Sequence, residues 1–374
     1  MPVALLVVTL LSWMSPPPDV PPADRLDFIR RAQVWTETNV AAFDFTAGEG
    51  EFTAWSTVTC DHAEKKYSGK TPKFGCAITP GEITKVKYGV DNNEVYAGVA
   101  ATRLLRALGF GVDPLYPVRV ECRGCPASLG GAPGGPNVSV FAVAALERKM
   151  KGKEVTLGGK DGWVWSELDL IDPAAGGAPR AQRDALKLMA VFLQHTDNKT
   201  EQQRLTCLPA PATAAPVPPL PADTTPATPA PAATTSAARA PFTCERPFMY
   251  VHDLGNTFGE ANKFNRGSIS GVNLAKWSSA PIWKDAGQCI GNLSKSFTGN
   301  LSHPKISEEG RKFLADLLVQ LTDAQLRDLF TVAHFAQGPE RMRVATGTAE
   351  DTVTAWVEAF KKKRAEIVDA KCPS

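Results

Sequence analysis

The segment HTDNKTEQQ, residues 195–203, combines side chains suited to phosphoryl transfer. Lys199 lies two residues after Asp197, and Gln202 lies five residues after it. Phosphoryl transfer needs a carboxylate to orient the attacking hydroxyl, a cation for the phosphates and oxygen ligands for magnesium. A carboxylate, an ammonium group and an amide oxygen at these offsets therefore make the segment a candidate catalytic loop.

A second carboxylate stands in HDLGNTFG, residues 252–259, where Asp253 is followed by Leu and Gly. Asp197 and Asp253 are 56 residues apart, but residues 208–241 between them are almost pure Pro, Ala and Thr. That composition predicts a disordered or polyproline-like insert, because it offers almost no large apolar side chains to bury. Without the 34 residues of the insert, the two carboxylates are 22 residues apart.

Together, the D-x-K-x-x-Q pattern at Asp197 and the D-L-G at 253–255 resemble the catalytic segments of the protein-kinase-like superfamily. Protein kinases carry Lys two residues and Asn five residues after the catalytic Asp, and a D-F-G farther on. A helix that runs directly into the loop is similar to atypical bacterial and secretory-pathway members. The resemblance implies an α+β, protein-kinase-like two-lobed fold with a small antiparallel-sheet N-lobe and a mostly helical C-lobe. It also implies ATP, or another nucleoside triphosphate, and Mg²⁺ as cofactors.

The resemblance assigns a role to each of these side chains. Asp197 would orient or deprotonate the acceptor hydroxyl, and Lys199 would stabilise the transferred phosphoryl group. Asp253 and Gln202 would bind the metal. Gln202 stands where kinases have Asn; its amide oxygen can still bind Mg²⁺, although the longer side chain is less rigid. Gln203 is an alternative ligand.

The N-terminal half supplies candidates for the nucleotide site. In ITKVKYG, residues 83–89, Lys85 and Lys87 share one face of a predicted strand, since side chains alternate with a period of two. Either lysine is a candidate for the phosphates, and Glu94 at the start of the next predicted helix is its candidate partner. The alternative is two solvated strand lysines and an acidic residue that stabilises a helix start.

Two further segments complete this interpretation. TAGEGEF, residues 46–52, is a candidate shortened glycine-rich turn over the phosphates. VAALERK, residues 143–149, is the candidate hinge that meets the adenine.

Hydrophobic periodicity predicts the elements that position these residues. Helices are expected at 24–41, 92–110 and 179–195, short antiparallel strands between 43 and 88, two more strands at 116–122 and 137–147, and mostly helix from 163 onward. The predicted organisation is a signal peptide with a Pro-rich linker (1–22), an N-terminal lobe (23–148) and a helical catalytic lobe (149–374) that contains the insert 208–241.

The overall composition sets limits on the partners. The 374 residues are 43% hydrophobic, which is enough for a sizeable core, and the formal net charge is only +2. The net charge is therefore too small to attract the protein as a whole to nucleic acid or to anionic lipid. We expect a monomer that binds a nucleotide and a hydroxyl-bearing acceptor, with no nucleic-acid partner and no stable transmembrane span.

The N-terminus and the cysteines favour export. The apolar run VALLVVTLLSWM is too short to span a bilayer but suits the apolar region of a signal peptide, although a basic start and a clear cleavage site are missing. Eight cysteines beside such a segment indicate disulfides, with 105 possible connectivities. Pairing in sequence order is the simplest: 60–76, 122–125, 207–244 and 289–372. CRGC at 122–125 also admits a redox dithiol or half of a zinc site.

The resulting hypothesis is an exported kinase-like phosphotransferase that moves a phosphoryl group from a Mg-nucleotide to a hydroxyl of a protein, a sugar or a lipid headgroup. Two alternatives are a catalytically inactive kinase-like binding or scaffold protein, and an AMP transferase on the same fold.

Overall fold

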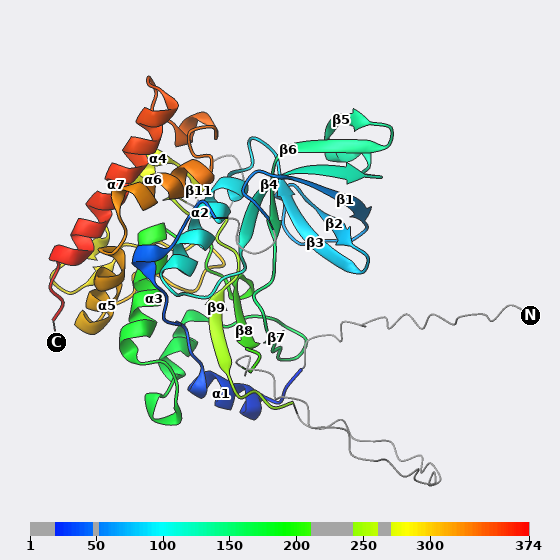
Figure 1. Cartoon of the computed structure of the whole chain (residues 1–374). Helices are drawn as coiled ribbons and strands as arrows, with labels where there is room; N and C mark the ends of the chain where they lie inside the picture. Colours follow the sequence, from blue (N-terminus) through cyan, green and yellow to red (C-terminus); the bar gives the residue numbers. More distant parts are fainter. Residues whose placement is uncertain (1–18, 48–51, 211–241, 261–270, 374) are drawn as a thin grey trace, which may run out of the picture.

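The computed structural model describes residues 19–47, 52–210, 242–260 and 271–373. Most of the predicted signal segment 1–22, residues 48–51 of the predicted glycine-rich turn and residues 211–241 of the predicted insert lie outside these ranges. The described chain is a mixed α/β structure with a six-stranded sheet and several helices (Figure 1).

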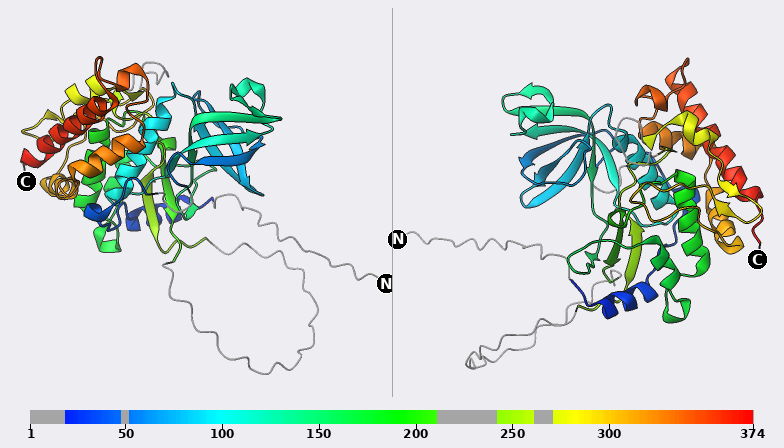
Figure 2. Two further views of the ribbon diagram at one scale, coloured as in Figure 1. Left: turned by 45° about the horizontal axis from the view of Figure 1, so that its top comes forward. Right: turned by 180° about the vertical axis from the view of Figure 1, so that it is seen from behind.

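A strongly curved sheet is formed by the first six strands, which gather on one side of the molecule in all three views (Figures 1 and 2). The strand order is β3-β2-β1-β4-β6-β5, and β3 also pairs with β6, so five of the strands close into a ring. The strands are β1 (Thr57–Ala63), β2 (Lys73–Thr79), β3 (Glu82–Tyr88), β4 (Leu115–Arg123), β5 (Ala132–Gly135) and β6 (Val138–Glu147).

The expectation of a purely antiparallel sheet is wrong at one pairing. β1 and β4 run parallel, with Thr57 opposite Arg119 and Cys60 opposite Cys122, whereas the other pairs in the sheet are antiparallel. The reason is topological. A closed ring of five strands cannot alternate direction at every step, so at least one neighbouring pair must be parallel.

The helices gather mainly on the other side of the molecule, and α2 packs against β4 (Figure 1). The predicted helices at 92–110 and 179–195 are present as α2 and α3. The predicted helix 24–41 is shorter: it ends at Arg31, and the chain then extends to form isolated bridges at Gln33 and Trp35. The α-helices are α1 (Pro22–Arg31), α2 (Asn93–Ala107), α3 (Arg180–Leu193), α4 (Leu274–Ser279), α5 (Glu308–Leu318), α6 (Asp323–Val332) and α7 (Ala349–Asp369), and the 3₁₀ helices are Val40–Ala42, Ala127–Leu129, Trp165–Leu170, Pro173–Ala175, Thr200–Gln202 and Glu340–Met342.

The C-terminal half contains strands that the sequence analysis missed. β7 (Lys153–Glu154), β8 (Gln203–Cys207) and β9 (Pro247–Val251) form a three-stranded antiparallel sheet, and β8 directly follows the candidate catalytic loop. The remaining strands are β10 (Gly259–Glu260), β11 (Gly271–Val272), β12 (Trp283–Asp285) and β13 (Ile290–Gly291). Each of these strands has at most five residues, too few for a period of two to stand out in the sequence.

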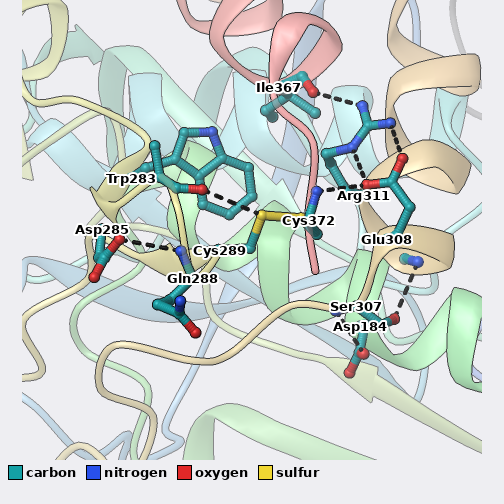
Figure 3. Close-up of a disulfide and its surroundings, with 12 residues drawn as sticks. Asp184, Trp283, Asp285, Gln288, Cys289, Ser307, Glu308, Arg311, Ile367 and Cys372 are labelled. Carbon is teal, nitrogen blue, oxygen red and sulfur yellow. Dashed lines mark hydrogen bonds and ion pairs between the residues drawn. A yellow bond between two sulfur atoms is a disulfide. The ribbon is translucent and has the colours of Figure 1, made fainter. Parts of the chain in front are cut away.

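The predicted cysteine pairing is confirmed: all eight cysteines lie in four pairs in sequence order, with Cα–Cα distances of 5.4–5.7 Å. In Figure 3, the pair Cys289–Cys372 attaches the segment after α7 to the turn between β12 and β13. Glu308 accepts the Cys372 amide hydrogen at 2.8 Å, and Arg311 bonds both Glu308 and the Ile367 carbonyl. The C-terminal end is therefore held by covalent and polar contacts. Among the described helices, none is long and apolar enough to cross a membrane.

Candidate active site

A buried lysine on β3 forms the centre of the site. The side chain of Lys87 is 2% exposed, and its ammonium nitrogen lies 3.1 Å from Glu94 Oε2, 3.1 Å from Asp253 Oδ1 and 3.7 Å from Glu147 Oε2. Burial by itself lowers the pKa of a lysine, but the three carboxylates outweigh it and hold the pKa of Lys87 well above its usual value. Lys87 is therefore a fixed cation that joins α2, β6 and the D-L-G segment.

Local sequence explains why Glu94 reaches this lysine. Asn92 donates a hydrogen bond to the Tyr88 carbonyl at the end of β3, and its side chain accepts the amide hydrogen of Glu94 at 3.1 Å. This cap begins α2 one turn from the end of β3 and places Glu94 in the first turn, where a carboxylate also suits the helix dipole. Gly255 lets the D-L-G segment approach closely, because a Cβ there would lie 2.5 Å from Glu94 Cγ.

The structure gives the two strand lysines different partners. Lys85 and Lys87 are on one face of β3, and both side chains reach Glu147, but Lys85 forms its ion pair with Glu147 alone among the described residues. Only Lys87 also contacts Glu94 and Asp253. Lys85, which lies opposite Glu147 in the β3–β6 register, instead fastens the end of β6 to β3.

Asp253 is held in its charged form. Burial raises the pKa of its carboxyl, but the charges of Lys87, Lys85 and His252 and a hydrogen bond from the Gly255 amide, at 3.1 Å, bring the pKa well below its usual value. Its side chain is still 24% exposed. An ionised and partly accessible carboxylate is the ligand that a hard divalent cation prefers.

The two segments that carry Asp197 and Asp253 meet at Gln202. Its side-chain amide donates to Asp197 Oδ2 at 3.2 Å, while its backbone carbonyl accepts the amide hydrogens of His252 at 2.7 Å and Asp253 at 3.4 Å. Asp197 is 6% exposed. Lys199 is half-buried, and its side chain forms no hydrogen bond or ion pair with any residue in the described ranges. The structure therefore joins the two segments, but not the two carboxylates themselves, through Gln202.

Asn198 is a structural residue of the loop that the sequence analysis missed. Fully buried, it donates to the carbonyls of His195 and Leu301, at 2.9 and 3.0 Å, and accepts the amide hydrogens of Asn300 and Leu301, both at 2.8 Å. A Cβ on Gly299 would lie 2.8 Å from Asn198 Oδ1. The segment around 299–301 therefore lies directly against the loop that carries Asp197. No sequence signal connects these segments, which are about a hundred residues apart.

A second missed group lies beside Lys85. His252 Nδ1 is 2.6 Å from Asp113 Oδ2, and His252 Nε2 is 4.0 Å from Glu147 Oε1. Burial raises the pKa of Asp113, but the hydrogen bond and charge of His252, together with hydrogen bonds from Met150 and Tyr250, outweigh it and lower the pKa. The three side chains offer ligand atoms within 4.8 Å of one another, although Glu147 already balances two lysines. We interpret the group as the support that holds β6 and the D-L-G segment together.

The connection between β1 and β2, residues 64–72, is the third missed part. It contains three lysines and a glycine, Gly69, with a φ of +85°. Thr71 donates a hydrogen bond to Glu94, and Lys73, just beyond, is half-buried with a pKa lowered by burial and by the charge of Lys87. The predicted turn at 46–52 instead precedes β1. Lysine-rich composition with a glycine was the signal available for 64–72.

The residues fit a magnesium-bound nucleotide in their donor chemistry. Asp253 offers a carboxylate. Gln202 donates its amide nitrogen to Asp197, which leaves the acceptor capacity of its amide oxygen for a metal ion. Both are hard oxygen ligands of the kind that Mg²⁺ takes. The ammonium group of Lys87, 3.1 Å from Asp253, and the lysine of the loop, Lys199, supply positive charge.

The chain is similar to solved structures of known proteins. The crystal structure of the Helicobacter pylori proinflammatory kinase CtkA is similar to this chain with a TM-score of 0.41 and 11% sequence identity, over 83% of this chain and 94% of that chain. A likeness at this level carries no argument about the site. No family model and no curated protein sequence matches the chain.

Proposed function

We propose that the protein is an exported kinase-like phosphotransferase of two lobes, which moves a phosphoryl group from a Mg-nucleotide, such as ATP, to a hydroxyl-bearing acceptor. The observation that carries the proposal is the contact of one buried lysine, Lys87, with Glu94 at 3.1 Å and Asp253 at 3.1 Å. A lysine paired with a helix glutamate beside a metal-binding aspartate is the arrangement that positions a nucleotide in kinases.

Each side chain then has a role in the proposed reaction. Lys87 binds the donor phosphates, Glu94 orients Lys87, and Asp253 and Gln202 hold the metal, whose charge would neutralise the developing negative charge. Asp197 orients the acceptor hydroxyl and takes its proton as the oxygen attacks. Lys199 stabilises the transferred group by its charge.

The exported location in this proposal rests on the cysteines and the N-terminal segment. Four disulfides form in an oxidising compartment, which indicates export, and the predicted signal segment agrees with this.

Two amide substitutions test the proposal. Asp253→Asn should weaken binding of a non-hydrolysable ATP analogue with Mg²⁺ at least tenfold in calorimetry, because a divalent ion loses its anionic ligand. Asp197→Asn should leave that binding nearly unchanged and lower transfer by about 10²–10⁴-fold, the usual range for general acid–base groups. Asp285→Asn, on β12, is a matched control that should change neither quantity. If wild type binds no nucleotide, or if both site variants bind as tightly as wild type, the proposal is wrong.

One observation favours the inactive scaffold as the second candidate. Asp197 is 6% exposed and is bonded to Gln202, so an acceptor hydroxyl reaches it only after a local rearrangement. A scaffold would bind nucleotide, or none, without transfer. Thermal shift with ATP and Mg²⁺, read beside a radiolabelled transfer assay, separates binding from catalysis.

A further inference from the structure

The described part of the chain contains a groove of about 1130 Å³. Its walls are the N-terminal segment 36–47, the α2–β4 connection, the segment 148–151 after β6 and the ends of the β8–β9 hairpin. Lys87, Glu94 and Asp253 are not among its lining residues. The groove therefore does not include these three residues, but Arg148 and Lys149, in the predicted hinge 143–149, line it.

The groove concentrates positive charge. Five cationic side chains line it against two acidic ones, Asp44 and Glu82, so the lining set carries +3 while the whole chain carries only +2. Glu82 is paired with Arg148, and Lys149 is paired with Glu154, which is not a lining residue, so the excess rests mainly on the other cations. The cationic residues are Arg106, Arg148, Lys149, Lys151 and Arg246. An excess of one sign in a concave surface raises the local concentration of ligands of the opposite sign.

The apolar side chains that line the groove indicate which kind of ligand it can bind. Phe110 and Phe248 are 2% and 1% exposed, so among the phenylalanines of the lining only the half-buried Phe43 has ring surface left for a ligand. Half-buried Phe43, Met150 and Leu208 supply apolar surface of the kind that takes side chains. The volume slightly exceeds the range of about 300–1,000 Å³ for small-molecule pockets, which favours a short polypeptide over a compact metabolite.

We propose that this groove binds a polypeptide segment of a partner protein that carries acidic side chains around an apolar residue. The acidic side chains meet Lys151 and Arg246, both exposed, and the apolar residue packs against Phe43 and Met150. Long-range attraction makes the association faster, and its strength depends on ionic strength.

Three fluorescein-labelled peptides test the proposal by anisotropy on the full chain, without nucleotide: EFEEFE, QFQQFQ and KFKKFK. EFEEFE should bind at least tenfold tighter than the other two and should weaken several-fold between 50 and 300 mM NaCl. Lys151→Gln combined with Arg246→Gln should weaken EFEEFE binding at least tenfold. The control pair Lys284→Gln and Lys371→Gln removes two exposed cations outside the groove and should leave binding unchanged.

Three outcomes would overturn the proposal. The first is that QFQQFQ binds as tightly as EFEEFE, which would remove the role of charge. The second is that the control pair weakens EFEEFE binding as much as the groove pair does. The third is that a six-nucleotide single-stranded DNA binds tighter than EFEEFE and competes with it, which would assign the groove to nucleic acid. Because the assay contains no nucleoside triphosphate, its result does not depend on whether the protein is a phosphotransferase.

Discussion

Replacing the central lysine should cost far more stability than replacing its neighbour on the same strand. In Lys87→Met, three carboxylates lose the cation that lies within 3.1–3.7 Å of them, and Lys85 is left as the other lysine in contact with Glu147. Removing one partner of a buried ion pair costs about 3–5 kcal/mol, because the remaining charge is desolvated without compensation. Lys85→Met removes one ion pair of a side chain that is 17% exposed, and should cost about 1–2 kcal/mol.

The stability lost in Lys87→Met should also depend on pH, in a direction that the pKa of Asp253 determines. In wild type the pKa of Asp253 is lowered, so the contribution of this group to stability is present above its unfolded pKa of about 3.9 and is lost as the pH falls below it. In Lys87→Met the main lowering charge is gone, and burial raises the pKa of the same carboxyl. The variant therefore gains stability relative to wild type as the pH falls from 7 to 4.5.

Urea unfolding, followed by the fluorescence of the eight tryptophans, measures both effects. The difference in free energy of unfolding between wild type and Lys87→Met should shrink by at least about 1.4 kcal/mol from pH 7 to pH 4.5, which equals one pKa unit. The reasoning is refuted if Lys87→Met costs no more than Lys85→Met at pH 7, or if its cost is the same at both pH values.

Three other predictions follow from single contacts. Asn198→Ala should destabilise the protein by about 3 kcal/mol in urea unfolding, because four buried hydrogen bonds are lost; an effect below about 1 kcal/mol would mean that the segment at 299–301 is held by other contacts. Burial lowers the pKa of His195 to about 4, so the free energy of unfolding should fall by about 2–4 kcal/mol as the pH drops from 6.5 towards 4. His195→Leu should abolish this fall, and an unchanged pH dependence in the variant would exclude His195 as its source. Replacing Cys289 and Cys372 by Ala should lower the free energy of unfolding by about 4.5 kcal/mol, the loop-closure value for a separation of 83 residues. Denatured, unreduced wild type should show no thiol that reacts with a labelling reagent, and free thiols would contradict the pairing.

Much of the site could be proposed from short stretches of sequence, because it depends on local geometry. The alternation of a strand puts Lys85 and Lys87 on one face whatever the surrounding fold is. Asn92 and Glu94 form a helix start that is readable from their positions alone. Pairing of the cysteines in sequence order was correct, although the separations range from 3 to 83 residues.

Other features depend on how distant segments meet, and local pattern carries no information about that. Which lysine contacts Glu94 was decided by the approach of α2 and the D-L-G segment to the end of β3. The helix predicted at 24–41 had the right apolar spacing, but bridges from Gln33 to β9 and from Trp35 to Phe110 extend the chain after Arg31. Tertiary contacts of this kind override propensity.

The sequence by itself determined the polar motifs, the strand faces, most of the long helices and the even set of cysteines, because each follows from residues a few positions apart. Only the tertiary structure decided the parallel β1–β4 pair, the β8–β9 hairpin and the meeting of Asp113, Glu147 and His252. The parallel pair follows from closing a ring with an odd number of strands. The other contacts join residues 34 to 139 positions apart, whose proximity is set by packing of the whole chain.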